Sequence, residues 1–393
     1  MIDQLIAYNI EELQKHKLLA ECNDLQKTGF LNQEQWKSIQ AKFACQLFHP
    51  AFFMRILFFI LSIIGMFTVI GPIGLALGSM GEDGFRFLAT LLGVGLLVFT
   101  EFFLIGSKKH YKSGITEAGI YAGFTFIYWG ILGFDSNMLT YILVGLVFSA
   151  FAAIRYLNLL GLIASLFLFG WLVFYASFET GGMVQAMIPF TFMAVFIAIY
   201  WLSCWAEARL QNCVFDNQFI IMQSIALIVI YASGNYFVVR ELSVNMMDLE
   251  LADGQNIPFA YLFYLTTAIT PFFYVYWGLR QRSLLFLRVG LLTIAISVVT
   301  LKYYFSLGMP VVSITAAGAV MIALALWVMK YLKHSRNGFT RELIFKDKWM
   351  TSEVTGIIAS QTLGGNNTGS GMEADSDLMQ GGEFGGGGAG QRW

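Results

Sequence analysis

Two charged residues fall inside apolar runs of this sequence and are the first candidates for chemistry. Glu101 lies in an apolar run over residues 85–106, and Lys302 lies in another over residues 289–307. A charge at the centre of a bilayer costs about 2.5–3.5 kcal/mol, so such residues are candidates for transport or proton relay. The two residues approach opposite surfaces of a membrane, each about 8 Å from the nearer one, so we expect no direct ion pair between them.

Both charges also have a structural alternative. A long side chain can run along apolar surface while its charged end reaches the headgroup region. Lys302 would then reach the outer headgroups, and Glu101 would meet a cation at the inner face: Lys108, Lys109 or Arg288.

A polar stretch with a proline interrupts the apolar run over residues 257–278. Thr266, Thr267 and Thr270 are followed by Pro271, which lacks the backbone N–H that a helix uses. Transporters with interrupted helices place such breaks beside their substrate site. The alternative is a kink whose free carbonyl is satisfied by neighbouring hydroxyls.

Residues that could hold a metal are few. Cys45 and His49 are four apart, a spacing that can supply two ligands from one helix face, and Cys22 would have to complete the site. Reduced thiols are the simpler expectation, so we predict no metal and no other cofactor. The sequence also lacks the common nucleophile, zinc-protease, phosphate-loop and dinucleotide motifs, which favours a non-enzymatic protein.

Composition places these residues in a membrane. The 393 residues are 57% hydrophobic and 12% charged, which excludes a soluble globular protein. A net charge of −1 gives no basis for nucleic-acid binding. Apolar runs of about 20 residues alternate with short polar breaks, and each run can cross a hydrocarbon core of about 30 Å.

The predicted fold is an all-α, polytopic bundle of about ten transmembrane helices. The predicted spans are 56–78, 85–106, 115–133, 138–154, 159–177, 187–206, 219–239, 257–278, 289–307 and 311–332. The break between 115–133 and 138–154 is short, so this pair could instead form a re-entrant hairpin.

The charges in the breaks alternate between the two sides. One side carries mainly cations: Lys108, Lys109, Lys112, Arg155, Arg209, Arg280, Arg282, Arg288, Lys330, Lys333 and Arg336. The other carries mainly acids: Glu82, Asp83, Asp135, Glu179, Glu241, Asp248, Glu250 and Asp253. Because cations concentrate on the cytoplasmic side, both termini are predicted to lie in the cytoplasm.

The segments outside the bundle differ in character. Residues 1–50 form a cytoplasmic amphipathic segment of two helices, one beginning near Ile2 and one that Asn32 and Gln35 start as a capping box and Pro50 stops. This segment could fold as a hairpin, pack on the membrane region of residues 51–335, or pair with a second copy or a partner protein. Residues 336–363 are basic and juxtamembrane, and residues 364–393 form a glycine-rich tail that we predict to be flexible.

The layout also carries a resemblance. The N-terminal helical segment, about ten spans with acidic outer loops, and the sequence from Tyr276-Trp-Gly-Leu-Arg-Gln-Arg-Ser283 through Gly290 to Lys302-Tyr-Tyr resemble a family of multi-pass bacterial predicted membrane proteins with a domain of unknown function. Separately, Gly381 to Trp393 is similar to the glycine-rich, Trp-terminated tails of TPM-domain-type proteins. The TPM domain itself is missing, so no activity carries over. The family resemblance implies a bacterial cytoplasmic (inner) membrane location.

Three function classes remain open from the sequence. A membrane enzyme would need at least two converging acid, base or nucleophile groups at one depth, and the few polar residues within the spans argue most strongly against it. A non-enzymatic scaffold or sensor would use the N-terminal helices and the glycine-rich tail as partner sites on a dry bundle. A secondary transporter or channel-like permease for a small solute would need a polar cavity at mid-depth, lined by Glu101, Lys302 or the threonines before Pro271.

Overall fold

The computed structural model describes residues 5–27, 29–76, 81–133, 136–181, 184–185, 187–210, 214–245, 256–281 and 283–304, with a few isolated positions between 318 and 330. All of them belong to one compact unit, Met1–Asp347. The tenth predicted span, over 311–332, lies almost wholly outside the described residues. The segments 336–363 and 364–393 lie outside them as well.

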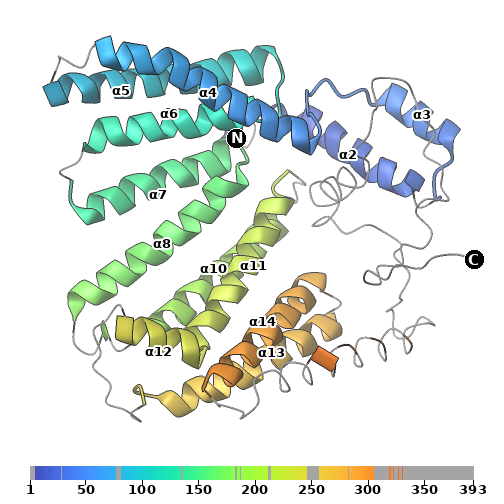
Figure 1. Cartoon of the computed structure of the whole chain (residues 1–393). Coiled ribbons are helices and arrows are strands. Elements are labelled where there is room, and N and C mark those ends of the chain that lie inside the picture. Colours follow the sequence, from blue (N-terminus) through green and yellow to red (C-terminus); the bar gives the residue numbers. More distant parts are fainter. Residues whose placement is uncertain are drawn as a thin grey trace, which may run out of the picture. The chain divides into compact units, whose positions relative to one another are not determined.

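Every regular element among the described residues is a helix (Figure 1). The N-terminal segment contains α2 (Ile10–Lys27) and α3 (Gln33–Lys42). The bundle contains α4 (Phe52–Ala76), α5 (Gly81–Val98), the π-helix η2 (Phe99–Ser107), α6 (Ile115–Leu132), α7 (Met138–Arg155), α8 (Leu159–Thr180), α10 (Ile188–Leu210), α11 (Asp216–Gly234), α12 (Tyr236–Asn245), α13 (Ala260–Gln281) and α14 (Leu284–Tyr304).

Six of the described helices are long and apolar enough to cross a membrane. They cover Phe52–Pro72, Gly81–Ser107, Met138–Arg155, Leu159–Thr180, Ile188–Leu210 and Asp216–Gly234. Large apolar side chains lie on their outer surfaces, with Phe87 72% and Trp201 75% exposed. Water would oppose such exposure and lipid would not, so the chain is an all-α, multi-pass membrane protein, as predicted.

Three further helices, α6, α13 and α14, coincide with predicted spans but are not among these six. α6 and α13 contain 18 and 22 residues, which is enough length to cross a membrane. Their threonines and tyrosines, together with Glu117 in α6 and Pro271 in α13, reduce their apolar character. The pair α6 and α7 consists of two separate helices of 18 residues each.

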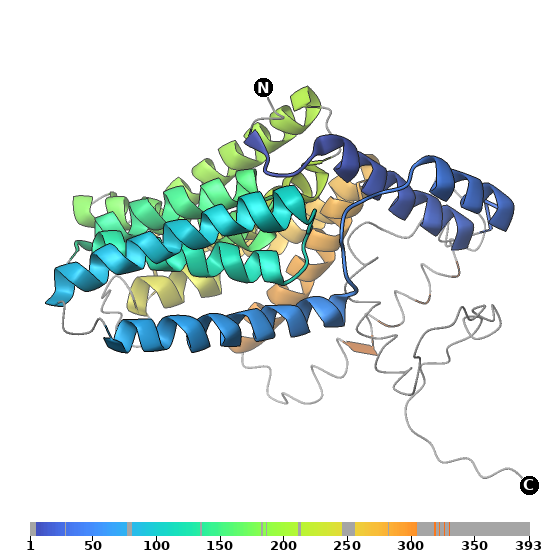
Figure 2. The ribbon, with the colours of Figure 1, turned by 90° about the horizontal axis from the view of Figure 1, so that it is seen from above.

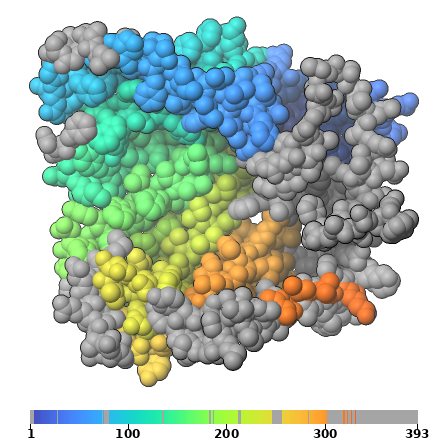
Figure 3. Space-filling view, in the orientation of Figure 1, coloured from blue at the N-terminus to red at the C-terminus, as the bar shows by residue number. Residues whose placement is uncertain are grey.

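Successive helices pair as hairpins: α5 with α6, α7 with α8, α10 with α11, and α13 with α14 (Figures 1 and 2). The pairs α7–α8 and α10–α11 adjoin through α8, where the colours of the space-filling view pass from green to yellow (Figure 3). Small residues permit the closest approach. A Cβ atom on Gly119 would lie 2.2 Å from Thr100 Oγ1, and one on Gly123 would lie 2.7 Å from the Leu97 side chain.

The N-terminal helices differ from the prediction at two boundaries. Residues 6–9 are not helical, so the first helix, α2, begins at Ile10, where the Asn9 side chain accepts hydrogen bonds from the backbone of Glu11 and Glu12 and caps the helix. The predicted start near Ile2 lies outside the described residues. The second starts at the predicted capping box but ends at Lys42 rather than at Pro50. The residues that follow this helix bond to the loop after η2 instead: Phe48 N donates to Lys109 O, and Phe48 O accepts from Tyr111 N.

A third difference lies in the predicted span 219–239. Helix α11 ends at Gly234, and Asn235 starts a separate short helix, α12. The Asn235 Oδ1 atom accepts hydrogen bonds from the backbone N–H groups of Phe237 and Val238, at 3.0 and 3.3 Å. The asparagine thus caps α12 and interrupts a segment whose composition alone favours one continuous helix.

The N-terminal segment, residues 5–50, packs on one end of the bundle. Its Ile6, Tyr8 and Leu13 are buried in one apolar cluster with Ile105, Ile120, Ala152, Tyr156 and Leu157. Two polar contacts accompany the cluster. Ala7 N donates to Arg155 O at 2.8 Å, and Lys17 Nζ lies 2.5 Å from Asp216 Oδ2. The connections that follow η2, α7 and α10 therefore all lie at the same end, as the alternation of charge requires.

Candidate functional site

Two polar centres lie within the bundle. We call the first the charged centre: Glu101, Arg155, Tyr156, Tyr121 and Asn158. We call the second the hydroxyl centre: Tyr231, Asn235, Thr267, Ser297 and Thr300. The first lies at the end of the bundle that the N-terminal segment covers, and the second lies among α11, α12, α13 and α14.

The charged centre is built by the π-helix that completes the second span. Glu101 lies in the first turn of η2, and its carboxylate pairs with the guanidinium of Arg155, the last residue of α7. The other carboxylate oxygen accepts a hydrogen bond from Tyr156 Oη at 3.0 Å. Both side chains of the ion pair are 25% exposed. The pair ties η2 to the end of α7.

The partner of Glu101 is therefore not Lys108, Lys109 or Arg288, the three expected from the sequence. Arg155 belongs to the same basic end, but tertiary packing brings it, rather than the loop after η2, to the carboxylate. Lys108 lies instead over the Phe103 ring, 5.6 Å from its centroid, and Lys109 bonds to Gln46. The sequence predicts the kind of partner but not the residue.

Of the remaining members of the charged centre, Asn158 caps a helix and Tyr121 bonds to its side chain. Asn158 Oδ1 accepts from Gly161 N at 2.7 Å and so starts α8, while its Nδ2 donates to Tyr121 Oη at 2.9 Å. Nearby, Glu117 Oε2 accepts from Gly114 N at 2.7 Å and from Thr116 Oγ1 at 2.9 Å. Each of these polar groups thus has a partner within the fold.

The hydroxyl centre forms a hydrogen-bond chain whose direction is determined. Asn235 Nδ2 donates to Tyr231 Oη at 2.8 Å and to Thr300 Oγ1 at 3.2 Å. Ser297 Oγ donates to the carbonyl of Thr267 at 2.9 Å, so the 2.6 Å bond between Tyr231 and Ser297 has the tyrosine as its donor. The chain connects α11, α14 and α13 through buried neutral groups.

This chain also explains the proline in α13. Pro271 has no N–H, so the carbonyl of Thr267, four residues earlier, lacks its helical partner. Ser297 supplies the missing donor. The Thr267 hydroxyl in turn accepts from Tyr236 N at 2.9 Å and donates to Phe263 O at 2.6 Å. The second alternative from the sequence, a break satisfied by neighbouring hydroxyls, describes this site.

The other predicted site residues are placed as follows. Thr266 Oγ1 contacts Gly234 O, the last carbonyl of α11, at 2.5 Å. Thr270 is half-buried on the same helix. Lys302 lies in α14, but its side chain is outside the described residues. Glu101 and the threonines lie in different centres, so the structure does not bring them together.

Cys45 and His49 were considered from the sequence as two ligands of a metal site. Across the parts of the chain that the structure describes, no three His, Cys, Asp or Glu side chains gather closely enough to hold an ion. Cys45 Sγ instead lies 3.6 Å from Glu12 O, where a thiol is a weak donor.

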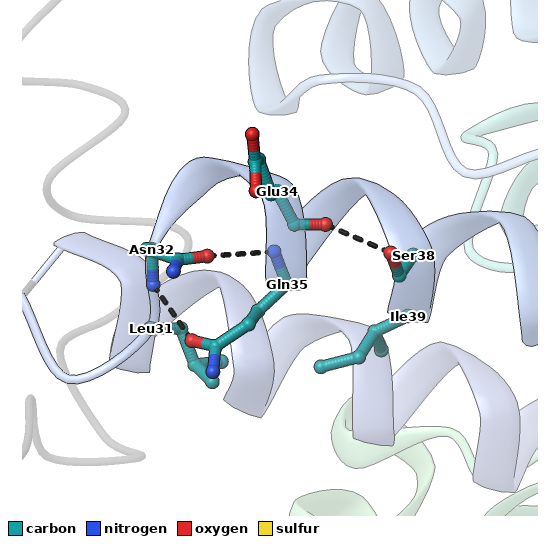
Figure 4. A pocket seen from close by; sticks show the side chains of 6 residues that line it. All are labelled: Leu31, Asn32, Glu34, Gln35, Ser38 and Ile39. Atoms are coloured by element: carbon teal, nitrogen blue, oxygen red, sulfur yellow. Dashed lines mark hydrogen bonds between the residues drawn. The ribbon is translucent and has the colours of Figure 1, made fainter.

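A shallow pocket lies on α3. Its lining residues are Leu31, Asn32, Glu34, Gln35, Ser38 and Ile39 (Figure 4). The capping box occupies one end of it: Asn32 Oδ1 accepts from Gln35 N at 2.8 Å, and Gln35 Oε1 accepts from Asn32 N at 3.0 Å. No residue of α3 is fully buried, and most of them are exposed, with Trp36 and Ile39 half-buried.

Sequence reasoning missed Asn235, Tyr231 and Ser297. A signal was present, because Asn235 follows a glycine inside a predicted span, and Ser297 and Thr300 are three apart and share a helix face. Polar residues at such positions in a membrane helix indicate a partner helix. Which helix that is cannot be inferred from spacing.

Comparison with known proteins adds no further residue roles. No protein-family model matches the chain, and no curated protein and no solved structure matches it either. The functional argument therefore depends on the geometry.

Proposed function

We propose that this protein is a non-enzymatic scaffold or sensor of the cytoplasmic (inner) membrane, with about ten transmembrane helices and both termini in the cytoplasm. The observation that supports it is the docking of residues 5–50 on one end of the bundle through the Ile6, Tyr8 and Leu13 cluster. A segment held in this way couples the membrane region to helices that are free to meet a cytoplasmic partner. The resemblance to multi-pass bacterial membrane proteins is consistent with the same location.

The orientation is supported by charge. Lys108, Lys109, Lys112 and Arg155 all lie at the end that carries the N-terminal segment. Since lysine and arginine concentrate in cytoplasmic loops, this end faces the cytoplasm. In a cysteine-free background, Glu82→Cys should react with a membrane-impermeant maleimide added to intact cells, and Ser107→Cys should not. Labelling of Ser107→Cys alone would reverse the orientation.

A secondary transporter is the alternative, and one feature favours it: two interrupted helices, at Asn235 and Pro271, lie side by side. Against it, the hydroxyls between them bond to one another and to carbonyls of the same helices. A substrate would have to break this chain before it could bind.

Water access separates the two functions. A scaffold or sensor with a dry bundle leaves Thr267→Cys unreactive toward a small charged thiosulfonate applied to either face of reconstituted vesicles. Reaction from either face would support transport and contradict our proposal. Ser107→Cys serves as the reactive control.

The partner role is tested on α3. A photo-cross-linking amino acid at Ser38, which lies in the pocket of Figure 4, should give a discrete protein adduct in cells. The same group at Phe167, which is 67% exposed on a predicted lipid-facing surface, should give none. Absence of adducts at Ser38 and at Glu34 would count against a scaffold that uses α3.

A further inference from the structure

Three of the four histidines of the chain lie where the N-terminal segment meets the bundle. His16 is on α2, His49 follows α3, and His110 is in the loop after η2. The fourth, His334, lies outside the described residues. The first two form a pair, since their ring centroids are 4.8 Å apart with the rings nearly perpendicular. Tyr111 completes the cluster, with its ring 5.6 Å from His16 and 5.5 Å from His49.

The hydrogen bond of His49 fixes its neutral tautomer. Its Nδ1 lies 3.0 Å from the carbonyl oxygen of Tyr111. A carbonyl can only accept, so Nδ1 carries the proton and Nε2 is the nitrogen that remains free to bind one. Proton uptake at Nε2 would make this ring a cation.

The charges that act on the pair come from two parts of the chain. Helix α4 contributes Arg55, and the loop after η2 contributes Lys112 beside Tyr111. Elsewhere in the segment, Glu12 and Lys15 bind each other at 2.9 Å, and the second Glu12 oxygen accepts from Gln46 N at 2.8 Å. A protonated histidine would therefore add a positive charge beside two cations.

Burial and these cations lower the pKa of the histidines. Burial lowers the pKa of His49 to about 4 against the hydrogen bond to the Tyr111 carbonyl, which favours the protonated ring, and Arg55, His16 and Lys112 add to the effect of burial. Burial also lowers the pKa of His16, assisted by Lys112 and Arg55. The pKa of His110 is lowered by burial as well. All three rings are thus held neutral by the docked arrangement.

We propose that the His16–His49 pair is a proton-binding site that couples docking of the N-terminal segment to cytoplasmic pH, so that the proton is the ligand of the sensor. The inference depends on the proposed sensor function and on the cytoplasmic orientation. At neutral pH both rings are neutral and pack edge to face. When the cytoplasm acidifies, the undocked segment binds protons at His16 and His49 that the docked segment excludes.

The direction of the effect follows from linkage. A histidine with an ordinary pKa of 6.5 when undocked and a lower one when docked stabilises the docked state fully only above about pH 6.5. Docking weakens as the pH falls through that value, and the loss levels off near pH 4, where His49 is protonated in place. At pH 5.5 His49 alone should weaken docking about tenfold.

Amide hydrogen exchange on the full chain in nanodiscs measures docking directly. The opening constant of α2, corrected for the intrinsic pH dependence of exchange, should rise at least about tenfold between pH 7.5 and pH 5.5. The amides of α8 and α11, which lie within the bundle, should show no comparable change. Equal opening of α2 at the two pH values would overturn the proposal.

Variants identify the groups. His49→Gln and His16→Gln should each reduce the pH response, and the double variant should leave at most the part that His110 contributes. His49→Lys carries a permanent charge and should open α2 at pH 7.5, with α8 protection reporting that the bundle is folded. Lys112→Gln removes a cation and should shrink the response. His334→Gln is the matched control and should leave it unchanged. An undiminished response in the double glutamine variant would contradict the proposal.

Failure here and failure of the proposed function remain distinguishable. If the opening of α2 does not depend on pH and Thr267→Cys is unreactive, only the proposed proton-binding site is contradicted. If Thr267→Cys reacts from either face, the proposed sensor with a dry bundle is contradicted, whatever the opening of α2 shows. External labelling of Ser107→Cys would place the histidines outside the cytoplasm and would overturn the cytoplasmic part of the inference.

Discussion

The charged centre and the hydroxyl centre place polar groups in the same lipid-facing bundle by different means. Glu101 and Arg155 meet as opposite charges, one quarter exposed, beneath a segment from outside the bundle. Asn235, Tyr231 and Ser297 meet as neutral groups, 0%, 2% and 8% exposed, and need no outside segment. Where water and headgroups are near, charge is tolerated; where they are excluded, the fold uses hydroxyls and an amide.

The difference has a mechanical consequence. The hydroxyl centre joins four helices through bonds that salt and protons do not affect at neutral pH. The end that carries the charged centre holds its covering segment through Lys17, two histidines and an apolar cluster, which respond to salt and pH. One region therefore serves as framework, and the other can respond to conditions.

The largest effect is expected at Asn235. Asn235→Ala removes the two hydrogen bonds that Asn235 Nδ2 donates, to Tyr231 and Thr300, and it also removes the cap of α12. We therefore expect a loss of about 2–4 kcal/mol in the free energy of unfolding. The apparent unfolding temperature in detergent should fall equally at low and high salt. Asn137→Ala, at the exposed start of α7 where the side chain makes no cap, is the control and should stay within about 0.5 kcal/mol. Equal losses of stability for Asn235→Ala and Asn137→Ala would contradict a framework role for the hydroxyl centre.

The ion pair comes next. Glu101→Gln leaves the Arg155 charge without its counter-charge, and because the pair is partly exposed we expect a loss of about 1–2 kcal/mol. The double variant with Arg155→Gln should lose less than the sum of the two single changes. Glu34→Gln on exposed α3 should have almost no effect. Additive losses would mean that the two charges act independently.

The proline break gives a smaller and more specific effect. Ser297→Ala removes the donor to Thr267 O and should cost about 1 kcal/mol. Pro271→Ala restores a backbone N–H that can satisfy the same carbonyl, so Ser297→Ala should cost clearly less in that background. A double-mutant cycle on the unfolding temperature measures the coupling. An unchanged cost would show that the carbonyl does not depend on Ser297.

The smallest effect is expected at Lys17. Its pair with Asp216 is about one quarter exposed on both sides, so Lys17→Ala should weaken docking of α2 by about 0.2–1 kcal/mol. The loss should shrink at high salt, and it should show in the exchange of α2 amides but not of α14 amides. Lys37→Ala, exposed on α3, is the control. A salt-independent loss would place the effect in packing rather than charge.

Local sequence determined what local physics controls. Apolar runs of membrane length predicted the described bundle helices to within a few residues at most ends, and Asn32 with Gln35 predicted the start of α3. Both follow from interactions a few residues apart. The break at Asn235 was missed although its cap is local, because the apolar composition of the segment favours one continuous helix. Its bond to Thr300 in α14, 65 residues away, could not be inferred from local sequence.

The sequence by itself determined the class of this protein, an all-α multi-pass membrane protein, because hydrophobic composition and helical period suffice for that. It also identified Glu101 and Thr267 as polar positions that need partners, and Pro271 as a break that leaves a carbonyl without its helical donor. Only the tertiary structure decided that the partners are Arg155, Tyr236 and Ser297, and that three histidines gather where the N-terminal segment meets the bundle. Partner choice depends on which helices pack together, and nothing in the spacing of one helix encodes the identity of its neighbour.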